Sequence, residues 1–406
     1  MTGAKAGLDQ LAPEGRRVLL RVDFNVPLTE KGQPRDDARI RAAVPTIEEL
    51  RRRGAALVLM THLGRPGGRI VPLLSTRCLV APLERLLGTP VAWVGESVGP
   101  EPEAAAKRLH PGQVLLLENL RFHEGETAND PDFARQLARL GDVYVDDAFG
   151  AAHRSHASTE GLPHLLPAFA GRLLAQELGA LTEVVDNPVR PLVAIVGGSK
   201  LSTKLALLEH LLERVEGLLL GGAMAATFLK AAGREVGTSL VEDDLLDRAL
   251  DVVALASRRA VDLQLPLDAL VAPGPGSRAA EVRVVAVEDV PPELMILDIG
   301  PETVRRWGEL VAGAGTVVWN GPLGLYENPL FAGGTGAMAR AIAGSAARSV
   351  TGGGDLQAAI GALHLEGGFD HVSTGGGATL EFLEGRILPG VAALPDLEQV
   401  ASAQQP

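Results

Sequence analysis

Short runs of apolar, often β-branched residues alternate along this chain with stretches of helical periodicity. The runs that predict strands cover residues 17–22, 56–61, 114–117, 143–145, 192–196, 217–220, 316–319, 349–351 and 371–373. Strands that alternate with helices form parallel sheets with helices packed on both faces. The pattern therefore predicts an α/β fold, in which ligands bind outside the carboxyl ends of the strands.

Two glycine triplets near the end of the chain, Gly352-Gly353-Gly354 and Gly375-Gly376-Gly377, each follow a predicted strand and precede a helix-like stretch. This arrangement aims backbone N–H groups and the positive end of a helix dipole at an anion, and the missing Cβ atoms let phosphate oxygens approach. Asp355 follows the first triplet and is a candidate Mg²⁺ ligand, since Mg²⁺ takes one or two carboxylates with phosphate oxygens and water. These features predict a phosphoryl-transfer site, the alternative being ordinary tight loops.

Lysine is rare in this chain, where arginine supplies most of the positive charge. Two of the six lysines, Lys200 and Lys204, nevertheless stand four residues apart directly after a glycine turn. Like charges at this spacing on a helix are slightly unfavourable, so a specific use of the ammonium groups is indicated. The alternative is a pair of solvated lysines.

Length and charge limit the classes of protein to which the chain can belong. A chain of 406 residues is too long for one core and predicts two domains. The net charge of −12 argues against binding to nucleic acid or to an anionic membrane through a basic surface. Cys78 is the only cysteine, which excludes an internal disulfide. Without an apolar signal segment or a run long enough to span a membrane, we expect a soluble, cytoplasmic enzyme.

Predicted strand ends in the first half of the chain carry arginines, whose planar guanidinium groups suit phosphate and carboxylate. If these ends converge, Arg39, Arg65, Arg121 and Arg154 form a cationic pocket in which Asp23 and Asn25 can bind a hydroxyl. Taken singly, each arginine could equally be a solvated surface residue. The prediction depends on several of them falling where strands end.

An ordered set of motifs over residues 17–394 resembles the phosphoglycerate kinase family. The matching segments are 21–27, 62–66, 117–122, 147–150 with His153-Arg154, 197–204, 319–322, 352–355 and 373–378. The resemblance implies two three-layer αβα domains with parallel Rossmann-like sheets, joined by an interdomain helix and a hinge. Residues 1–170 would bind the acid substrate, with the tail 391–406 packing back on them. Residues 171–186 would form the connecting helix, and 187–390 the nucleotide-binding domain.

The resemblance also assigns roles to individual residues. The implied ligands of the acid substrate are Asp23, Asn25, Arg39, His62, Arg65, Arg121 and Arg154. The implied nucleotide site consists of Gly198, Lys204, Gly221, Gly222, Asn320, Pro322, Glu327, Gly352, Gly353, Gly354 and Asp355, and Asp355 would hold Mg²⁺. The residues implied in catalysis are Arg39, Lys200, Lys204, Gly354, Gly375 and Gly376. Three positions depart from the commonest family pattern: Leu356 replaces Thr, Ala223 replaces Gly and Thr203 replaces Asp.

The resemblance therefore predicts reversible phosphoryl transfer between ATP and 3-phosphoglycerate, which gives 1,3-bisphosphoglycerate and ADP. The expected partners are these small molecules, with Mg²⁺, and no nucleic acid or membrane; the expected oligomeric state is a monomer. Two alternatives stay open. One is a family member that phosphorylates the carboxylate of a related hydroxy acid, such as a phosphonate analogue. The other is a binding protein that has lost catalysis.

Overall fold

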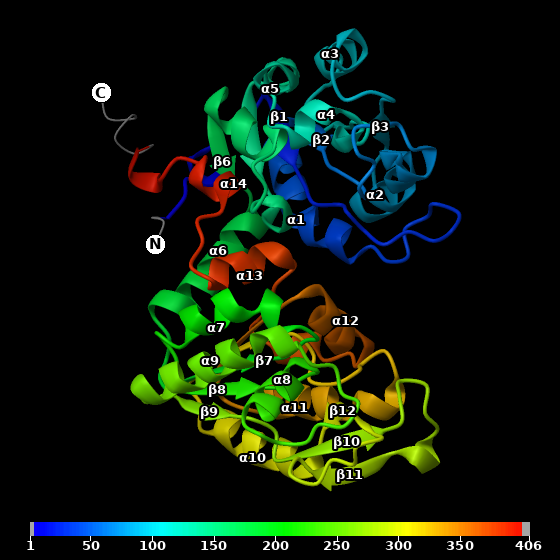
Figure 1. Ribbon diagram of the computed structural model, residues 1–406. Helices are drawn as coiled ribbons and strands as arrows, with labels where there is room; N and C mark the ends of the chain where they lie inside the picture. The colour runs from blue at the N-terminus through cyan, green and yellow to red at the C-terminus, as the bar shows by residue number, and fades with distance from the viewer. Residues whose placement is uncertain (1–3, 400–406) are drawn as a thin grey trace. The chain divides into compact units, whose positions relative to one another are not determined.

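The computed structural model describes residues 4–399, so residues 1–3 and the end of the predicted tail, 400–406, lie outside the described part. The chain forms two compact units (Figure 1). The first contains the chain up to Gly179 and from Ile387 onwards, and the second runs from Ala180 to Arg386. The helix α6 (Arg172–Asp186) passes from the first unit into the second.

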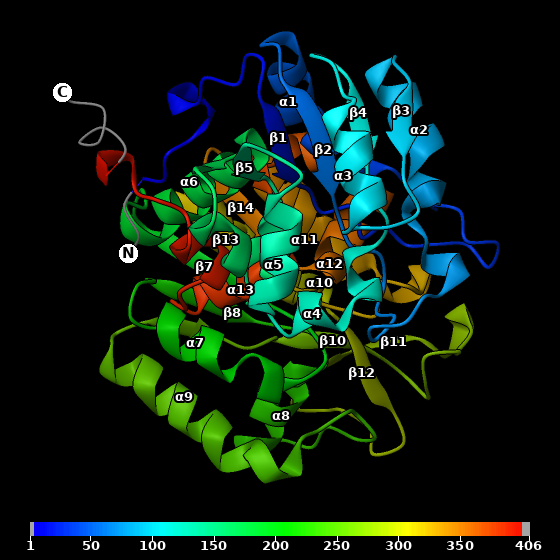
Figure 2. The ribbon, with the colours of Figure 1, turned by 90° about the horizontal axis from the view of Figure 1, so that it is seen from above.

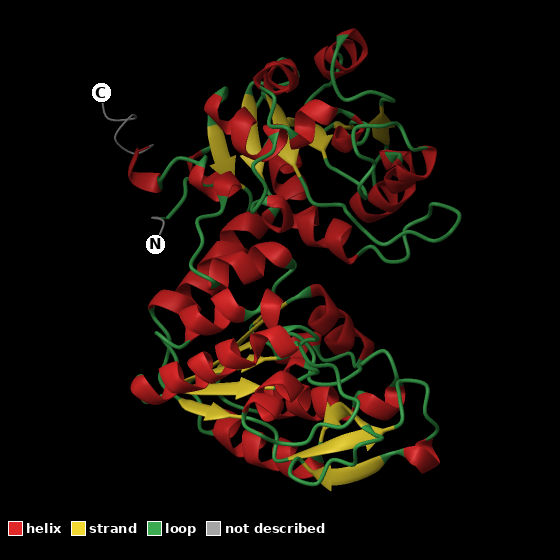
Figure 3. Ribbon diagram, in the orientation of Figure 1, coloured by secondary structure: helices red, strands yellow, loops and turns green. Residues whose placement is uncertain are grey.

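The first unit is built on a parallel six-stranded sheet with the order β3-β4-β2-β1-β5-β6. Its strands are β1 (Arg17–Arg21), β2 (Ala56–Met60), β3 (Val91–Trp93), β4 (Val114–Leu116), β5 (Val143–Asp146) and β6 (Ala168–Ala170). Its other helices are α1 (Ala38–Arg52), α2 (Val80–Leu87), α3 (Pro100–Lys107), α4 (Glu124–Thr127), α5 (Pro131–Ala138) and α14 (Pro389–Ala392). Figure 3 distinguishes these strands and helices by colour.

Burial on both faces explains why the strands of this sheet are continuous apolar runs. Val18 and Leu20 of β1 point to one face, where they join a core with Ile40 and Ile47 of α1. Leu19, between them, is also fully buried, and side chains alternate between the faces of a strand. A polar residue could therefore be accommodated only at the ends of these strands, which is where the site residues stand.

Residues 387–399 complete the first unit from the far end of the chain. The Ala6 N–H donates to the Pro395 carbonyl at 3.0 Å, and the Leu397 N–H donates to Ala4 at 2.7 Å. Lys5 Nζ lies 2.8 Å from the Asp396 carboxylate. Within the same segment, the Gly390 N–H of α14 donates to the Ala152 carbonyl at 2.8 Å.

The second unit has its own parallel six-stranded sheet, with the order β15-β14-β13-β7-β8-β9. Its strands are β7 (Leu192–Val196), β8 (Gly217–Leu220), β9 (Asp262–Gln264), β13 (Thr316–Asn320), β14 (Arg348–Gly352) and β15 (His371–Val372). Its further helices are α7 (Leu205–Leu211), α8 (Met224–Ala231), α9 (Leu246–Arg258), α10 (Pro301–Ala312), α11 (Gly333–Ala343), α12 (Gly354–Ala362) and α13 (Gly377–Leu383). Helix α8 packs on α9, and α10 packs on α11 (Figure 2).

A three-stranded antiparallel sheet, absent from the sequence-based prediction, adds to the second unit. It has the order β11-β10-β12, with β10 (Asp268–Ala272), β11 (Arg283–Ala286) and β12 (Met295–Ile299). Ala226 and Leu229 of α8 pack against Ala269 and Val271 of β10. The α/β fold with two parallel sheets is confirmed, and each of the predicted strands is present with its ends within one residue.

Candidate functional site

The acid-site residues of the first unit stand at the carboxyl ends of neighbouring strands. Asp23 and Asn25 follow β1, His62 follows β2, Arg121 lies in the turn after β4, and Arg154 comes after β5. Arg39 lies in the first turn of α1. Because β1 has β2 on one side and β5 on the other, the chain changes direction across the sheet here, which is where open α/β sheets bind ligands.

Asp23 and Asn25 are held by polar contacts in their turn. Arg39 Nη1 donates to Asp23 Oδ2, and the Asn25 N–H donates to Asp23 Oδ1 at 3.2 Å. Asn25 Oδ1 accepts the Gly64 N–H at 2.8 Å. A Cβ at Gly150 would come within 2.3 Å of Asp23 Oδ2, so a larger residue there would force the Asp23 carboxylate to move. The contacts fix both side chains at one edge of the sheet.

His62 is buried in this pocket, and Arg121 is partly buried. Burial, with the positive charges of Arg21, Arg121 and Arg39, holds the pKa of His62 well below its usual range. Burial also lowers the pKa of Arg121 to about 10, and Arg21 adds to this effect. Arg121 Nη1 donates to the Gly64 carbonyl at 2.9 Å. The imidazole is therefore neutral and the guanidinium groups around it carry the charge.

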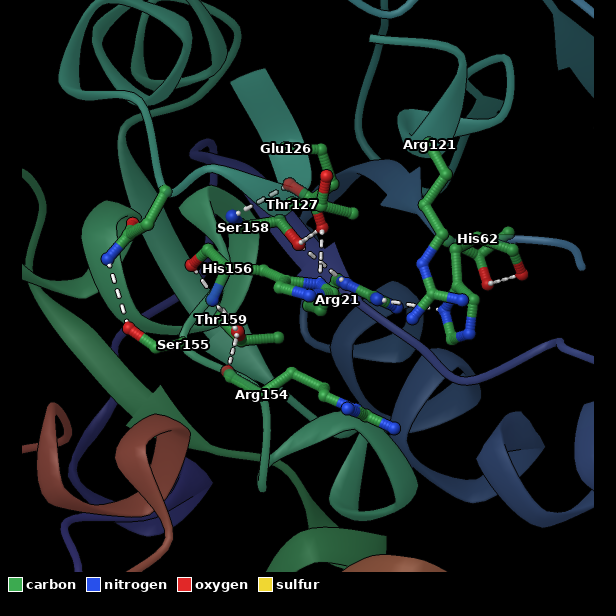
Figure 4. Close-up of polar contacts among 12 residues, drawn as sticks. Arg21, His62, Arg121, Glu126, Thr127, Arg154, Ser155, His156, Ser158 and Thr159 are labelled. Carbon is green, nitrogen blue, oxygen red and sulfur yellow. Dashed lines mark hydrogen bonds and ion pairs between the residues drawn. The ribbon is translucent and has the colours of Figure 1, made fainter. Parts of the chain in front are cut away.

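The structure brings some of the predicted arginines together and leaves others at the rim. Arg39 and Arg121 are partly buried and interact electrostatically with His62. Arg154 is exposed but still acts on the pKa of Arg121. Arg65 is exposed beside Gly64, the residue that accepts from Arg121. Figure 4 shows His62, Arg121 and Arg154 in one view with Arg21.

Sequence reasoning missed a buried network behind this pocket. Arg21, the last residue of β1, is fully buried. Its guanidinium contacts His62 Nδ1 and Ser158 Oγ, and Ser158 in turn binds Glu126 (Figure 4). Arg21 belongs to one of the motifs, but a sequence cannot tell an arginine that binds a ligand from one that supports a neighbour.

Three loops of the second unit meet main chain to main chain at the carboxyl ends of β7, β8 and β13. The Gly197 N–H donates to the Asn320 carbonyl at 2.8 Å, and the Gly198 N–H donates to Pro322 at 3.0 Å. The Gly222 N–H donates to the Leu323 carbonyl at 3.1 Å. Since β7 is flanked by β8 and β13, this is the topological switch point of the second sheet.

Lys204 connects these loops to the first glycine triplet. Its Nζ donates to Asn320 Oδ1, and Asn320 Nδ2 donates to the Gly352 carbonyl at 2.9 Å. Burial lowers the pKa of Lys204, while the carboxylates of Glu384 and Asp355 oppose this shift. Lys200 is exposed; burial opposes a lowered pKa of Glu242, but hydrogen bonds from Ser202 lower it, and the charge of Lys200 adds to them. The two lysines thus occupy different environments.

A mainly apolar cavity of about 220 Å³ adjoins these loops. Gly198, Gly222 and Pro322 form part of its wall, and Glu327 and Asp355 stand at its lining as well. Burial raises the pKa of Tyr326, and the neighbouring carboxylates of Asp355 and Glu327 add to this shift. Apolar side chains dominate this lining, which suits an apolar ring, and Glu327 and Asp355 add two carboxylates to it.

The two triplets differ in their local geometry. Gly353 precedes α12, which begins at Gly354, and a Cβ at Gly354 would meet no atom within 4 Å. The first N–H groups of α12 have no acceptor within the helix, because none precedes them at the required spacing. In the second triplet the Gly375 N–H donates to Ser373 Oγ at 3.1 Å. Asp355, in the first turn of α12, is exposed.

Comparison with known proteins decides the family. The chain matches the phosphoglycerate kinase family over residues 8–386. It is 53% identical to phosphoglycerate kinase of Moorella thermoacetica over 393 residues, which cover 97% of this chain and 100% of that protein. The chain belongs to the phosphoglycerate kinase family. It is also 52% identical over 395 residues to the phosphoglycerate kinase of a Roseiflexus species, with 97% and 100% coverage.

Solved phosphoglycerate kinase structures have the same fold as this chain. The structure of the Coxiella burnetii protein covers 99% of this chain and 100% of its own, with a TM-score of 0.87 at 39% identity. The Pyrococcus horikoshii protein gives a TM-score of 0.85 at 30% identity, with 98% and 100% coverage. Among the residues described, no helix combines the length and apolar character of a membrane span.

The departures from the commonest phosphoglycerate kinase pattern have structural explanations in two cases. Leu356 is fully buried and packs in the core with Ile360 and Trp319, so it serves the interior of the unit. Thr203 is exposed, and its Oγ1 donates to the Lys200 carbonyl at 2.9 Å. Ala223 lines the cavity beside Gly222 and narrows it by one methyl group.

Proposed function

We propose that this chain catalyses reversible transfer of the γ-phosphoryl group of ATP to the carboxylate of 3-phosphoglycerate. Membership of the phosphoglycerate kinase family is the observation that carries the proposal. The products are 1,3-bisphosphoglycerate and ADP. A kinase that transfers phosphate to a carboxyl group needs one site for an anionic acid and another for a nucleotide.

The pocket of the first unit is assigned to the acid. The charges of Arg39, Arg121 and Arg154, with Arg65 at the rim, would bind the phosphate and carboxylate. Asp23 and Asn25 would meet the hydroxyl, since both are acceptors fixed in one turn. His62, neutral and buried, would contribute a hydrogen bond rather than a charge.

The cavity of the second unit is assigned to the nucleotide. Gly198, Gly222 and Pro322, which line the cavity, would contact the adenine, and Glu327 the ribose hydroxyls. Gly221, predicted for the same site, is buried next to Gly222 and lies outside the cavity lining. The phosphates would lie toward Lys204, Asn320 and the first triplet, Gly352 to Gly354. Asp355 fits a Mg²⁺ ligand because it is an exposed single carboxylate beside this phosphate position, and phosphate oxygens and water would complete the shell. When bound, Mg²⁺ would neutralise phosphate charge.

Positioning and charge stabilisation are sufficient for this reaction. The acceptor carboxylate is already an ionised nucleophile, so no general base is required. Lys204, Lys200 and Arg39 would stabilise the charge on the transferring oxygens, together with N–H groups of Gly354, Gly375 and Gly376. The Gly375 N–H would have to exchange its bond to Ser373 for one to the phosphoryl group. The two sites belong to different units, and the hinge closure that the family implies would bring the two substrates together.

The runner-up, a paralogue that uses a phosphonate analogue, is not favoured by the comparisons, whose relatives are named phosphoglycerate kinase at about half identity. Steady-state assays of the purified protein with ATP against phospho- and phosphono-carboxylates would test the proposal. We expect 3-phosphoglycerate to have the highest kcat/KM by a wide margin, because a site built around a substrate hydroxyl can reject a misplaced one by roughly 10⁴. A phosphono-hydroxy acid that reacts faster would overturn it.

A further inference from the structure

We infer that Arg21 is a positioning residue for the acid substrate: it holds the proton of the His62 imidazole on Nε2 and so makes that nitrogen a permanent hydrogen-bond donor. The inference rests on the proposed function, because it assigns His62 to the acid site. It goes further in giving a role to a buried arginine outside the predicted ligand set. Figure 4 shows the residues involved.

The chemistry of the guanidinium fixes the direction of the contact with His62. Arg21 Nη2 lies 3.1 Å from His62 Nδ1, and both side chains are buried. An arginine has five N–H donors and no acceptor, so Nδ1 must accept in this bond. In a neutral imidazole one nitrogen accepts while the other carries the proton. His62 therefore presents Nε2–H.

The orientation of Arg21 is itself determined by two further acceptors. Its Nε donates to Ser158 Oγ at 2.9 Å, and its Nη1 donates to the Val22 carbonyl. With three separate edges of the planar group engaged, the guanidinium cannot rotate without breaking a buried hydrogen bond. Lysine could supply the charge but not this geometry.

Ser158 can accept from Arg21 because its own proton is already committed. Ser158 Oγ donates to Glu126 Oε1 at 2.6 Å, and the Ser158 N–H donates to Glu126 Oε2 at 3.0 Å. The Ser158 carbonyl accepts from the Tyr144 hydroxyl at 2.8 Å. Glu126 is fully buried, so its carboxylate balances the charge of Arg21 through one serine. The two side-chain hydrogen bonds therefore run in one direction, from Arg21 to Ser158 and from Ser158 to Glu126.

The surroundings also keep His62 from becoming a second cation. Burial acts first, and the charges of Arg21, Arg121 and Arg39 disfavour the imidazolium further. A neutral imidazole without Arg21 would exchange between two tautomers, and one of them presents a lone pair on Nε2. With Arg21 in place, an oxygen of the substrate meets an N–H each time it binds. The arginine thus affects acid binding without touching the acid.

The first test needs no variant. A long-range ¹H–¹⁵N correlation spectrum of the ligand-free wild-type protein reports which nitrogen of each neutral histidine carries the proton, and His62→Gln assigns the signal. We expect His62 as a single Nε2–H tautomer at neutral pH. A proton on Nδ1, an equal mixture of tautomers, or an imidazolium would overturn the inference, whatever the kinetics show.

The second test uses Arg21→Lys with Arg17→Lys as its matched control. Arg17 lies on the same strand, where it pairs with Asp142 at 2.6 Å on the exposed end of the sheet. We expect Arg21→Lys to give a mixture of His62 tautomers and to raise KM for 3-phosphoglycerate by the reciprocal of the fraction that keeps the proton on Nε2, about tenfold where that fraction is about one in ten. KM for ATP should stay within about twofold in both variants, and Arg17→Lys should keep the single tautomer.

The outcomes separate this inference from the proposed function. Wild-type protein inactive toward 3-phosphoglycerate would contradict the proposed function, while the tautomer of His62 would still be measured. Arg21→Lys with an unchanged acid KM would overturn the positioning role. If that variant does not fold, Ser158→Ala replaces it, since this substitution retains Arg21 but removes one of its acceptors. It should change the tautomer and the acid KM in the same direction by a smaller amount. No change in either quantity would refute the inference.

Discussion

The contact between main chains at the nucleotide site can be tested by adding one methyl group to Gly222. This residue has a φ of +69°, and a Cβ there would lie 2.6 Å from both the nitrogen and the oxygen of Gly198. Gly233, which follows the end of α8 in the same unit, has a φ of +80° but no atom within 4 Å of the added Cβ. Alanine at either position carries the free-energy cost of a positive φ, but only at Gly222 does the added Cβ also overlap with neighbouring atoms.

The expected magnitudes follow from this geometry. A residue with a Cβ in the left-handed region costs about 1–2 kcal/mol, and this is the whole loss of stability expected for Gly233→Ala. In Gly222→Ala the neighbouring loop must also move: an ordinary contact of 3.4 Å exceeds 2.6 Å by 0.8 Å. Displacements near 1 Å in a positioned site can cost about 10²-fold in rate. We therefore expect kcat/KM for ATP to fall about 10²-fold in Gly222→Ala only.

Urea unfolding and steady-state kinetics of both variants provide the measurement. KM for 3-phosphoglycerate should change little in either protein, because the acid pocket belongs to the other unit. If Gly233→Ala and Gly222→Ala have the same kinetics for ATP, the close approach of these loops does not shape the nucleotide site. That result would remove Gly198 and Gly222 from the assigned site.

Two further predictions concern charged groups. Lys204→Ala should lower kcat by at least about 10²-fold with little effect on KM for the acid, because the charge that Lys204 meets develops during transfer. The control is Lys230→Ala, which removes an exposed ion pair with Asp243 and should keep wild-type turnover. Burial raises the pKa of Asp147 to about 7 from 3.8. Between these two pH values the folded protein therefore retains a proton that the unfolded chain has lost. The free energy of unfolding should consequently fall as pH rises from about 4 to 7. Asp147→Asn keeps an oxygen acceptor for the Leu173 N–H and should remove up to about 1.4 kcal/mol per pH unit of this slope. Urea unfolding at several pH values measures the slope. An unchanged slope would show that Asp147 is ionised in the folded state.

Most of the parallel architecture could be predicted, because fully buried strands such as β2 and β7 must be continuous apolar runs. Some of the missed strands lack that signal. Strand β3 has only three residues, of which Ala92 is exposed, and β11 is exposed along most of its length. The antiparallel sheet depends on contacts with α8 that a local pattern does not contain.

For the site, glycine turns and arginines at strand ends were visible in the sequence because their chemistry is specific to anions. The residues that hold these groups in place were not visible in the sequence. Arg21 reads as another anion ligand until its burial and its bond to His62 are known. Asp147 appears as one residue of a motif, yet its carboxylate accepts the N–H groups of Leu173 and Leu174 at the start of α6. The roles assigned to the individual site residues remain predictions for the assays above.

The return of residues 387–399 to the first unit has a consequence for synthesis. A ribosome releases the chain from its amino terminus, so the residues that open the first unit emerge long before Pro395 and Leu397, which hydrogen-bond to Ala6 and Ala4. The second unit is one continuous segment and has all its strands available earlier than the first unit has its closing piece. Domains ordinarily complete their folding in the order in which they are made. Here the unit that is begun first is finished last, and its nascent form lacks the hydrogen-bond partners of Ala6 and Ala152 until residues 387–399 have been made.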